Sequence, residues 1–173
     1  SGKPLVSLVG YTNAGKSTLF NKLSNSHVTA QNKLFATLDP VTRRVNLPSG
    51  DLMLLTDTVG FINKLPHTLI SAFHATLEDL QKTDLLLHIV DCSSPHCSQQ
   101  IRIVDDTLKS LGLADRPKLI IYNKVDLLTS KYGNADSMDS GKTDLFISAK
   151  SGFNTDSLLL DIQSSLVKAW KRR

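Results

Sequence analysis

The 173-residue sequence contains no long hydrophobic run and little cysteine, and each shortage excludes a class of protein. Its longest apolar stretches, at 85–90 and 119–122, are far shorter than the roughly 18 residues that cross a bilayer, so we expect no membrane span. The two cysteines, Cys92 and Cys97, cannot build a disulfide scaffold, and they fit a reducing compartment. We therefore expect a cytoplasmic protein, with the mitochondrial matrix and the plastid stroma as alternatives.

The chain also has no large excess of charge of either sign. Charged residues make up 21% of the chain and the net charge is +4, which permits contact with RNA without demanding it. Apolar residues make up 40%, which argues against a disordered chain. The length fits one domain, at roughly 150 residues per domain, and we expect a monomer.

Strand-like and helix-like segments alternate along the chain, which is typical of a layered α/β domain. The sequence predicts a six-stranded, mostly parallel sheet with helices on both faces. The turn Pro48-Ser49-Gly50-Asp51 predicts a hairpin, which makes one strand antiparallel. Strands are predicted at 4–9, 41–47, 52–55, 85–90, 118–122 and 144–147, helices at 15–23, 68–80, 101–111 and 158–170, and long loops at 24–40 and 129–142.

A phosphate-binding motif follows the first predicted strand. The string Gly10-Tyr11-Thr12-Asn13-Ala14-Gly15-Lys16-Ser17-Thr18 matches G-x-x-x-x-G-K-[ST] between a strand and a helix, the context that the motif requires. Its backbone N–H groups and the helix N-terminus would face phosphate oxygens. We expect Lys16 to reach the β- and γ-phosphates and Ser17 to bind Mg²⁺. The predicted nucleotide-binding residues here are Asn13, Ala14, Gly15, Lys16, Ser17 and Thr18.

Three further motifs lie at predicted strand ends, where open α/β sheets bind ligands. Asp57-Thr58-Val59-Gly60 supplies a carboxylate for the Mg²⁺ hydration shell and a glycine N–H that can sense a γ-phosphate. Asn123-Lys124-Val125-Asp126 and Ser148-Ala149-Lys150 follow two later strands. With the phosphate loop, these motifs predict a three-layer P-loop NTPase of the Ras-like G-domain type, which hydrolyses GTP to GDP and phosphate.

The choice of guanine rests on Asp126. Its carboxylate can accept hydrogen bonds from guanine N1–H and the 2-amino group, whereas adenine lacks this pair of donors and would leave the carboxylate unpaired. Asn123 can bridge to the phosphate loop, the stem of Lys124 can pack on the base, and the Ala149 N–H can meet guanine O6. The predicted base-binding residues are Asn123, Lys124, Asp126, Ser148, Ala149 and Lys150.

The strings FATLDPVTRR (35–44), LLTDTVGFI (54–62), LPHTL (65–69) and AFHATLE (72–78) resemble the HflX family of ribosome-associated GTPases. The resemblance runs from about Val6 to Trp170. It implies a factor that binds the large ribosomal subunit and its RNA and that splits or rescues stalled ribosomes. Family members carry an N-terminal RNA-docking domain to which nothing here corresponds, so we expect residues 1–173 to be a single G domain from a longer protein.

The resemblance also implies roles for switch residues. Thr37 matches the switch I threonine that closes on Mg²⁺ and the γ-phosphate, and Asp57 and Gly60 match the switch II pair. Phe61 stands where Ras-like proteins place the glutamine that orients water, so we expect slow hydrolysis, on the order of 10⁻⁴ s⁻¹ or lower. The predicted catalytic residues are Lys16, Thr37 and Gly60, and the predicted metal ligands are Ser17, Thr37 and Asp57.

Several questions stay open at this point. Asn13 stands where potassium-using GTPases have an asparagine, so it either helps to hold K⁺ between phosphates or only hydrogen-bonds the loop. Arg43 and Arg44 either flank a switch or contact RNA, or they are plain solvated charges.

Cys92, His96 and Cys97 lack the fourth ligand and the spacing of a zinc site. A GTP-binding module with incidental hydrolysis, a small-molecule phosphotransferase and the use of ATP are the alternative functions.

Overall fold

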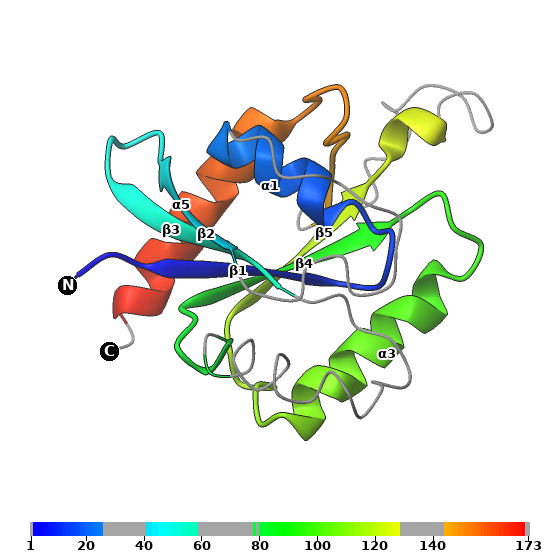
Figure 1. The fold of residues 1–173 in the computed structure, drawn as a ribbon, viewed down its shortest axis with the longest axis horizontal. Helices are drawn as coiled ribbons and strands as arrows, with labels where there is room; N and C mark the ends of the chain where they lie inside the picture. The colour runs from blue at the N-terminus through cyan, green and yellow to red at the C-terminus, as the bar shows by residue number, and fades with distance from the viewer. Residues whose placement is uncertain (1, 26–40, 59–77, 79, 129–143, 172–173) are drawn as a thin grey trace.

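Six strands form one sheet in the order β2-β3-β1-β4-β5-β6 (Figure 1). The computed structural model describes residues 2–25, 41–58, 78, 80–128 and 144–171. Neighbouring strands run parallel except for β2 and β3, so the predicted six-stranded sheet with one antiparallel strand is confirmed. The strands are β1 (Leu5–Gly10), β2 (Val41–Asn46), β3 (Leu52–Asp57), β4 (Leu85–Asp91), β5 (Lys118–Asn123) and β6 (Leu145–Phe146).

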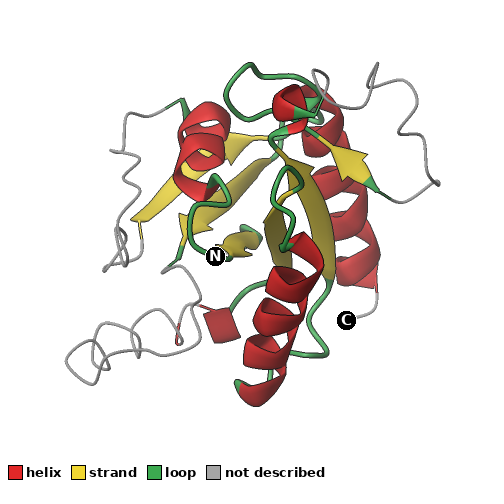
Figure 2. Cartoon of the chain, turned by 90° about the vertical axis from the view of Figure 1, so that its right-hand side faces the viewer, coloured by secondary structure: helices red, strands yellow, loops and turns green. Residues whose placement is uncertain are grey.

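Helices cover both faces of the sheet (Figures 1 and 2). α1 (Lys16–Ser24) and α5 (Thr155–Lys171) lie on one face, and α3 (Cys97–Ser110) lies on the other. Successive side chains of a strand point to opposite faces of the sheet: Leu87 and Ile89 of β4 pack with α1 and α5, whereas Leu86 packs with α3. Burying both faces is what makes the central strands almost continuously apolar.

The hairpin between β2 and β3 is confirmed at the predicted turn. The Gly50 N–H donates to the Leu47 carbonyl at 2.9 Å, and Gly50 has a φ of 92°, a left-handed conformation that glycine adopts without strain. Asn46 and Leu52 then form the first antiparallel pair. The turn is also tied to α5, because the Ser49 N–H donates to Gln163 Oε1 at 2.8 Å.

Two helices begin earlier than their apolar periodicity predicts. α3 begins at Cys97 rather than Ile101, and α5 begins at Thr155 rather than Leu158. The added first turn of α3 is polar, and it is helical because the Gln100 N–H donates to the His96 carbonyl at 2.9 Å. Apolar spacing reports where a helix contacts the core, so it misses a first turn made of polar residues.

Other bounds differ by one or two residues. β3 continues through Asp57, so this carboxylate belongs to the strand rather than to the turn after it. The short turn η2 (Val125–Leu127) follows β5 and was not predicted. The predicted loops fall on segments outside the described residues at 26–40 and 129–143, and the predicted helix at 68–80 is described only at 78 and 80.

The sheet brings the carboxyl ends of four strands together at one edge. Leu8 pairs with Asp57, Gly10 with Ile89, and Asp91 with Asn123, so β1, β3, β4 and β5 end within a few residues of one another. This edge carries the phosphate loop, Asp57 and the Asn123–Asp126 segment, and Ser148–Lys150 follows β6, the neighbour of β5. Among the described residues, no helix is both long enough and apolar enough to cross a membrane.

Candidate nucleotide-binding site

The phosphate loop turns sharply between β1 and α1, and two glycines permit it. A Cβ on Gly10 would stand 2.6 Å from the Ile89 carbonyl oxygen, so the close approach of β4 excludes any side chain there. Gly15 has a φ of 100°, and a Cβ would collide with the amide nitrogen of Asn123. Asn13, between them, is exposed and also left-handed, with a φ of 67°. These turns carry the chain into the N-terminus of α1, where helix amides attract anions.

Lys16 and Ser17 meet β3 at the next step. The Lys16 ammonium donates to the Thr58 carbonyl at 3.0 Å and lies 3.7 Å from Asp57 Oδ1. The Ser17 hydroxyl donates to Asp57 Oδ2 at 3.2 Å, although 40 residues separate the two in sequence. Thr58 is fixed in turn by its own hydroxyl, which donates to the Leu8 carbonyl. The predicted cluster of Lys16, Ser17 and Asp57 therefore exists.

This cluster fits Mg²⁺. A hydroxyl and a carboxylate oxygen are the hard ligands that Mg²⁺ takes in proteins, usually with waters and phosphate oxygens completing the shell. Asp57 is only 1% exposed, and a buried carboxylate needs a positive partner. The other predicted ligand, Thr37, lies outside the described residues, as do Gly60 and Phe61.

Asn123 connects the phosphate loop to the segment after β6. Its side chain is 2% exposed and uses both polar atoms, since Nδ2 donates to the Ala14 carbonyl at 2.9 Å and Oδ1 accepts from the Ala149 N–H at 2.9 Å. The expected bridge to the phosphate loop is therefore present. The Ala149 N–H differs from expectation, because its acceptor is Asn123 Oδ1; a bond from this N–H to guanine O6 stays a prediction.

A cavity of about 400 Å³ opens beside this bridge. Asp126 lies exposed at the start of η2, and the Ser148 hydroxyl is buried, accepting from the Ser151 N–H at 3.2 Å. The volume suits a purine base, because ligand pockets begin at roughly 300 Å³. The cavity is lined by Gly15, Thr18, Asn123, Lys124, Asp126, Leu127, Ala149 and Lys150.

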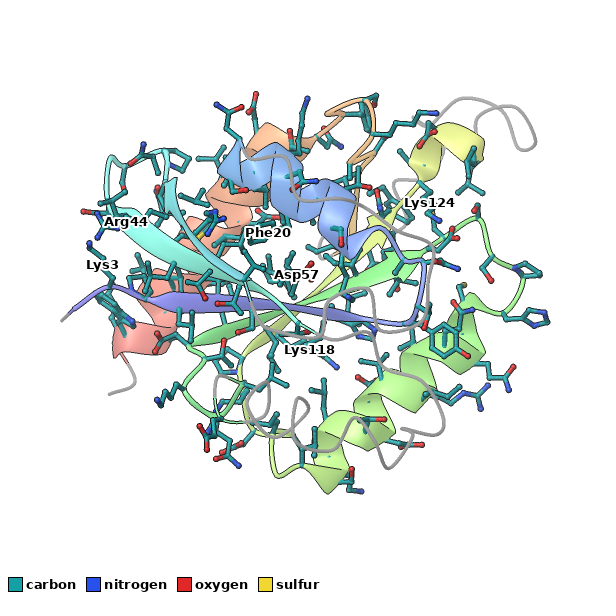
Figure 3. The ribbon with its side chains drawn as sticks, viewed as in Figure 1. Lys3, Phe20, Arg44, Asp57, Lys118 and Lys124 are labelled. Atoms are coloured by element: carbon teal, nitrogen blue, oxygen red, sulfur yellow. The ribbon has the colours of Figure 1, made fainter. Side chains whose placement is uncertain are left out.

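Lys124 directly follows β5, where Figure 3 labels it, and its side chain reaches the phosphate loop. Its ammonium donates to the Asn13 carbonyl at 2.7 Å and lies 3.2 Å from Asp91 Oδ2. Sequence reasoning missed Asp91, which ends β4. The signal was present in the Asp-x-Ser spacing to Ser93, which is typical of a turn in which the carboxylate accepts backbone and hydroxyl hydrogens.

Two further sets of candidates, Cys92 and the arginines of β2, differ in their relation to the site. Cys92 directly follows β4, and its thiol donates to the Asn123 carbonyl at 2.9 Å. Burial, assisted by Asp91, raises the pKa of the Cys92 thiol to about 11, so it stays protonated at neutral pH. Arg43 and Arg44 are exposed on β2, the edge strand, in keeping with a strand that leads away from the phosphate loop.

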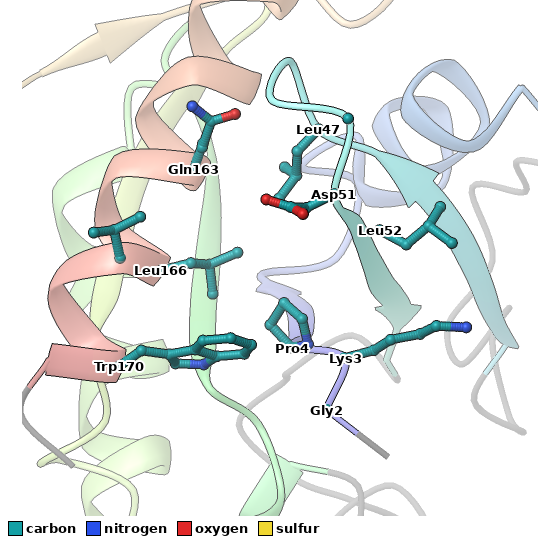
Figure 4. A pocket seen from close by; sticks show the side chains of 11 residues that line it. Gly2, Lys3, Pro4, Leu47, Asp51, Leu52, Gln163, Leu166 and Trp170 are labelled. Atoms are coloured by element: carbon teal, nitrogen blue, oxygen red, sulfur yellow. The ribbon is translucent and has the colours of Figure 1, made fainter.

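A larger cavity, of about 500 Å³, lies at the other end of β1 (Figure 4). It is bounded by the N-terminal segment at Lys3 and Pro4, the β2–β3 hairpin and the side of α5 that carries Leu166 and Trp170. None of the predicted site residues lines it. Cavity volume alone would favour this larger cavity as the ligand site. The polar groups that converge on the 400 Å³ cavity favour the smaller one instead.

Comparison with known proteins points to a family of GTPases. Residues 5–124 match the family model described as "50S ribosome-binding GTPase". The chain is 48% identical over 166 residues to "GTPase HflX" of Caldanaerobacter subterraneus subsp. tengcongensis, which covers 95% of this chain and 37% of that protein. It is 42% identical over 150 residues to "GTPase HflX" of Escherichia coli, covering 86% and 35%. The chain thus spans little more than a third of these relatives.

Solved structures agree in fold. The crystal structure of Aquifex aeolicus Era bound to GDP and AlF₄⁻ superposes with a TM-score of 0.74 at 25% identity, covering 93% of this chain and 56% of that one. A structure of Era in complex with MgGDPNP and a segment of 16S ribosomal RNA gives 0.72 at 25% identity, covering 94% and 56%. The predicted P-loop GTPase fold is confirmed.

Gly15→Ala tests whether the phosphate loop depends on its contact with Asn123. Gly50→Ala is the matched control, because Gly50 has a similar φ of 92° but nothing within 4 Å of a Cβ. A left-handed alanine costs about 1–2 kcal/mol, so Gly50→Ala should lower the free energy of unfolding by that amount and leave GDP affinity unchanged. Gly15→Ala should cost more and weaken GDP binding, as measured by urea unfolding and titration with fluorescent GDP. Equal effects of the two substitutions would contradict this account.

Proposed function

The chain belongs to the HflX family of GTPases, and from that premise we propose that it binds GTP with Mg²⁺ at the carboxyl edge of its sheet and hydrolyses it to GDP and phosphate. The observation that carries the proposal is the buried side chain of Asn123, which joins the phosphate loop at Ala14 to the base cavity at Ala149. One ligand that has both phosphates and a purine base would fill both regions at once.

Lys16, Ser17 and Asp57 would have different roles in GTP hydrolysis. Water attacks the γ-phosphorus, a P–O bond to the attacking oxygen forms, and the bond to the β–γ bridging oxygen breaks. Lys16 supplies positive charge where the phosphate oxygens gain negative charge, and the amides at the start of α1 supply hydrogen bonds. When bound, Mg²⁺ neutralises charge on the β- and γ-phosphates. Ser17 and Asp57 would hold it, and Thr37 would complete the shell in the GTP state.

The proposed output is a switch that acts on the ribosome. The γ-phosphate would order the segments that carry Thr37 and Gly60, and these would gate affinity for the large ribosomal subunit and its RNA. The family description, a 50S ribosome-binding GTPase, supports a ribosomal partner. The RNA in one Era structure supports contact of such a fold with ribosomal RNA. Splitting or rescue of stalled ribosomes is the role that we propose for the whole protein, in the cytoplasm or in an organelle that contains ribosomes.

A binding module that turns over little GTP is the second candidate. Phe61 favours it, since an apolar side chain cannot polarise water. The two functions share the nucleotide site and differ only in the rate of hydrolysis. A phosphotransferase is disfavoured because the Asn123–Asp126 and Ser148–Lys150 segments meet at a base cavity rather than at a second substrate site.

Asp126→Asn tests the choice of base. An asparagine keeps the volume but replaces one acceptor with a donor, so it opposes the guanine 2-amino group and matches the 2-carbonyl of xanthine. GTP affinity should fall about a hundredfold, since a base whose donors go unpaired costs a few kcal/mol, and affinity for xanthosine triphosphate should rise. Competition titrations with GTP, xanthosine triphosphate and ATP measure this. Asp115→Asn, at an exposed carboxylate before β5, is the control; an unchanged preference in Asp126→Asn would refute the assignment.

The proposed K⁺ site at Asn13 has a kinetic signature. A cation held between the α- and γ-phosphates would offset developing charge, so turnover should be about tenfold faster in K⁺ than in Na⁺ at matched ionic strength. Asn13→Gly should remove the difference while GDP affinity changes little, because glycine adopts the left-handed φ of 67° without strain and Lys124 binds the backbone carbonyl of residue 13 rather than its side chain. Equal rates of GTP turnover by the wild type in K⁺ and in Na⁺ would contradict the K⁺ site at Asn13.

Large ribosomal subunits should stimulate hydrolysis. We expect phosphate release on the order of 10⁻⁴ s⁻¹ or slower from the chain alone, because Phe61 replaces a water-orienting glutamine. Purified large subunits should raise this rate, and small subunits at the same concentration are the control. If large subunits neither stimulate hydrolysis nor sediment with the chain in its GTP-bound form, the ribosomal partner of this domain is wrong.

A further inference from the structure

Asp91 ends β4, and its carboxylate is held by two donors from a single residue. Oδ1 accepts from the Ser93 N–H at 2.9 Å and from the Ser93 hydroxyl at 2.5 Å. This turn orients the carboxylate and leaves Oδ2 facing the Lys124 ammonium at 3.2 Å. An exposed ion pair is usually worth little because two mobile side chains must be ordered. Here the Ser93 turn has already ordered one of them.

Lys124 is constrained as well. It has a φ of 68°, which is costly for a residue with a Cβ and is kept only where surrounding contacts impose it. Its ammonium bridges Asp91 and the carbonyl of Asn13, and Asn13 is itself left-handed, with a φ of 67°. One chain of contacts therefore runs from the end of β4, through the residue after β5, to the phosphate loop.

We propose that Asp91 is a positioning residue of the nucleotide site, which holds the Lys124 ammonium against the Asn13 carbonyl so that the phosphate loop is formed before nucleotide arrives. The inference rests on the proposed function in that the ligand is a guanine nucleotide. Asp91 itself stays off the ligand and acts through Lys124. Its effect is on the conformation of the empty loop and on the lifetime of the complex.

Asp91→Asn removes this action with little other change. The asparagine Oδ1 still accepts from Ser93, so the turn after β4 is kept, while Nδ2 presents hydrogens to the ammonium in place of a charged acceptor. Lys124 then loses the partner that directs it to Asn13. GDP and GTP should both dissociate about five- to tenfold faster, as expected for one partly exposed, charge-assisted hydrogen bond. The preference for guanine over xanthine should stay, because Asp126 is unchanged.

The matched control is the pair of Asp105 and Lys118, a second aspartate–lysine ion pair that joins α3 to the start of β5, away from the phosphate loop. Asp105→Asn should leave nucleotide dissociation unchanged. Lys124→Met keeps the apolar stem and removes the ammonium. If Asp91 acts through Lys124, Asp91→Asn should have no further effect in the Lys124→Met background. A purely structural role would instead make the two effects multiply.

Two measurements test the proposal. Stopped-flow displacement of fluorescent GDP gives the dissociation rates of wild type, Asp91→Asn, Lys124→Met, the double variant and Asp105→Asn. Hydrogen exchange of the amides at 12–15 in the nucleotide-free protein reports the loop itself, and it should quicken in Asp91→Asn but not in Asp105→Asn. The role of Asp91 would be overturned if Asp91→Asn changed neither the exchange of these amides nor the dissociation rate. It would also be overturned if exchange were unchanged and the effects of Asp91→Asn and Lys124→Met on dissociation multiplied. Failure of the wild type to bind GDP would overturn the proposed function, and the exchange data would still decide on Asp91.

Discussion

The buried amide of Asn123 is the contact on which the site depends, because it joins two loops that are far apart in the sequence by hydrogen bonds to both. One loop follows β1 and the other follows β6, and the amide meets a carbonyl in the first and an N–H in the second. Only a side chain that has both a donor and an acceptor satisfies both partners. An aspartate would set a carboxylate oxygen against the Ala14 carbonyl, and a leucine would leave two buried polar groups without partners, each at a cost of about 1–3 kcal/mol.

This contact explains neighbouring choices of residue. Nδ2 of Asn123 occupies the space where a Cβ of residue 15 would be, so glycine is required there by contact as well as by its φ. The parallel register sets Asn123 beside Asp91, and the thiol of Cys92 donates to the Asn123 carbonyl. The backbone and the side chain of Asn123 are thus held by different elements. The position of Asn123 therefore depends on the assembled sheet, and not only on the turn that follows β5.

The sequence predicts the sheet and the residues that meet at its carboxyl edge, because both depend on spacing along the chain. Buried strands read as apolar runs, and Lys16, Ser17 and Asp57 meet because parallel strands end at one edge. Periodicity cannot report the first turn of α3, which is polar. It also cannot find the pairing of Asp91 with Lys124 or the acceptor of the Ala149 N–H, since these follow from the register of β4 and β5 and from the rotamer of Asn123, which are set only when the sheet is assembled.

Left-handed residues surround the phosphate loop at Asn13, Gly15 and Lys124, and two of them carry side chains. Such conformations cost of order 1–3 kcal/mol each, so contacts elsewhere must hold them. Here the holding contacts come from Asp91 at the end of β4 and from Lys124, which follows β5. Asn123 and Lys124 both line the base cavity and both contact the phosphate loop. The base and phosphate halves of a nucleotide would bind as one unit, whereas Phe61 supplies no group to orient water. On the proposed function, the phosphate loop and the base cavity would suffice for binding, and fast turnover would need a partner.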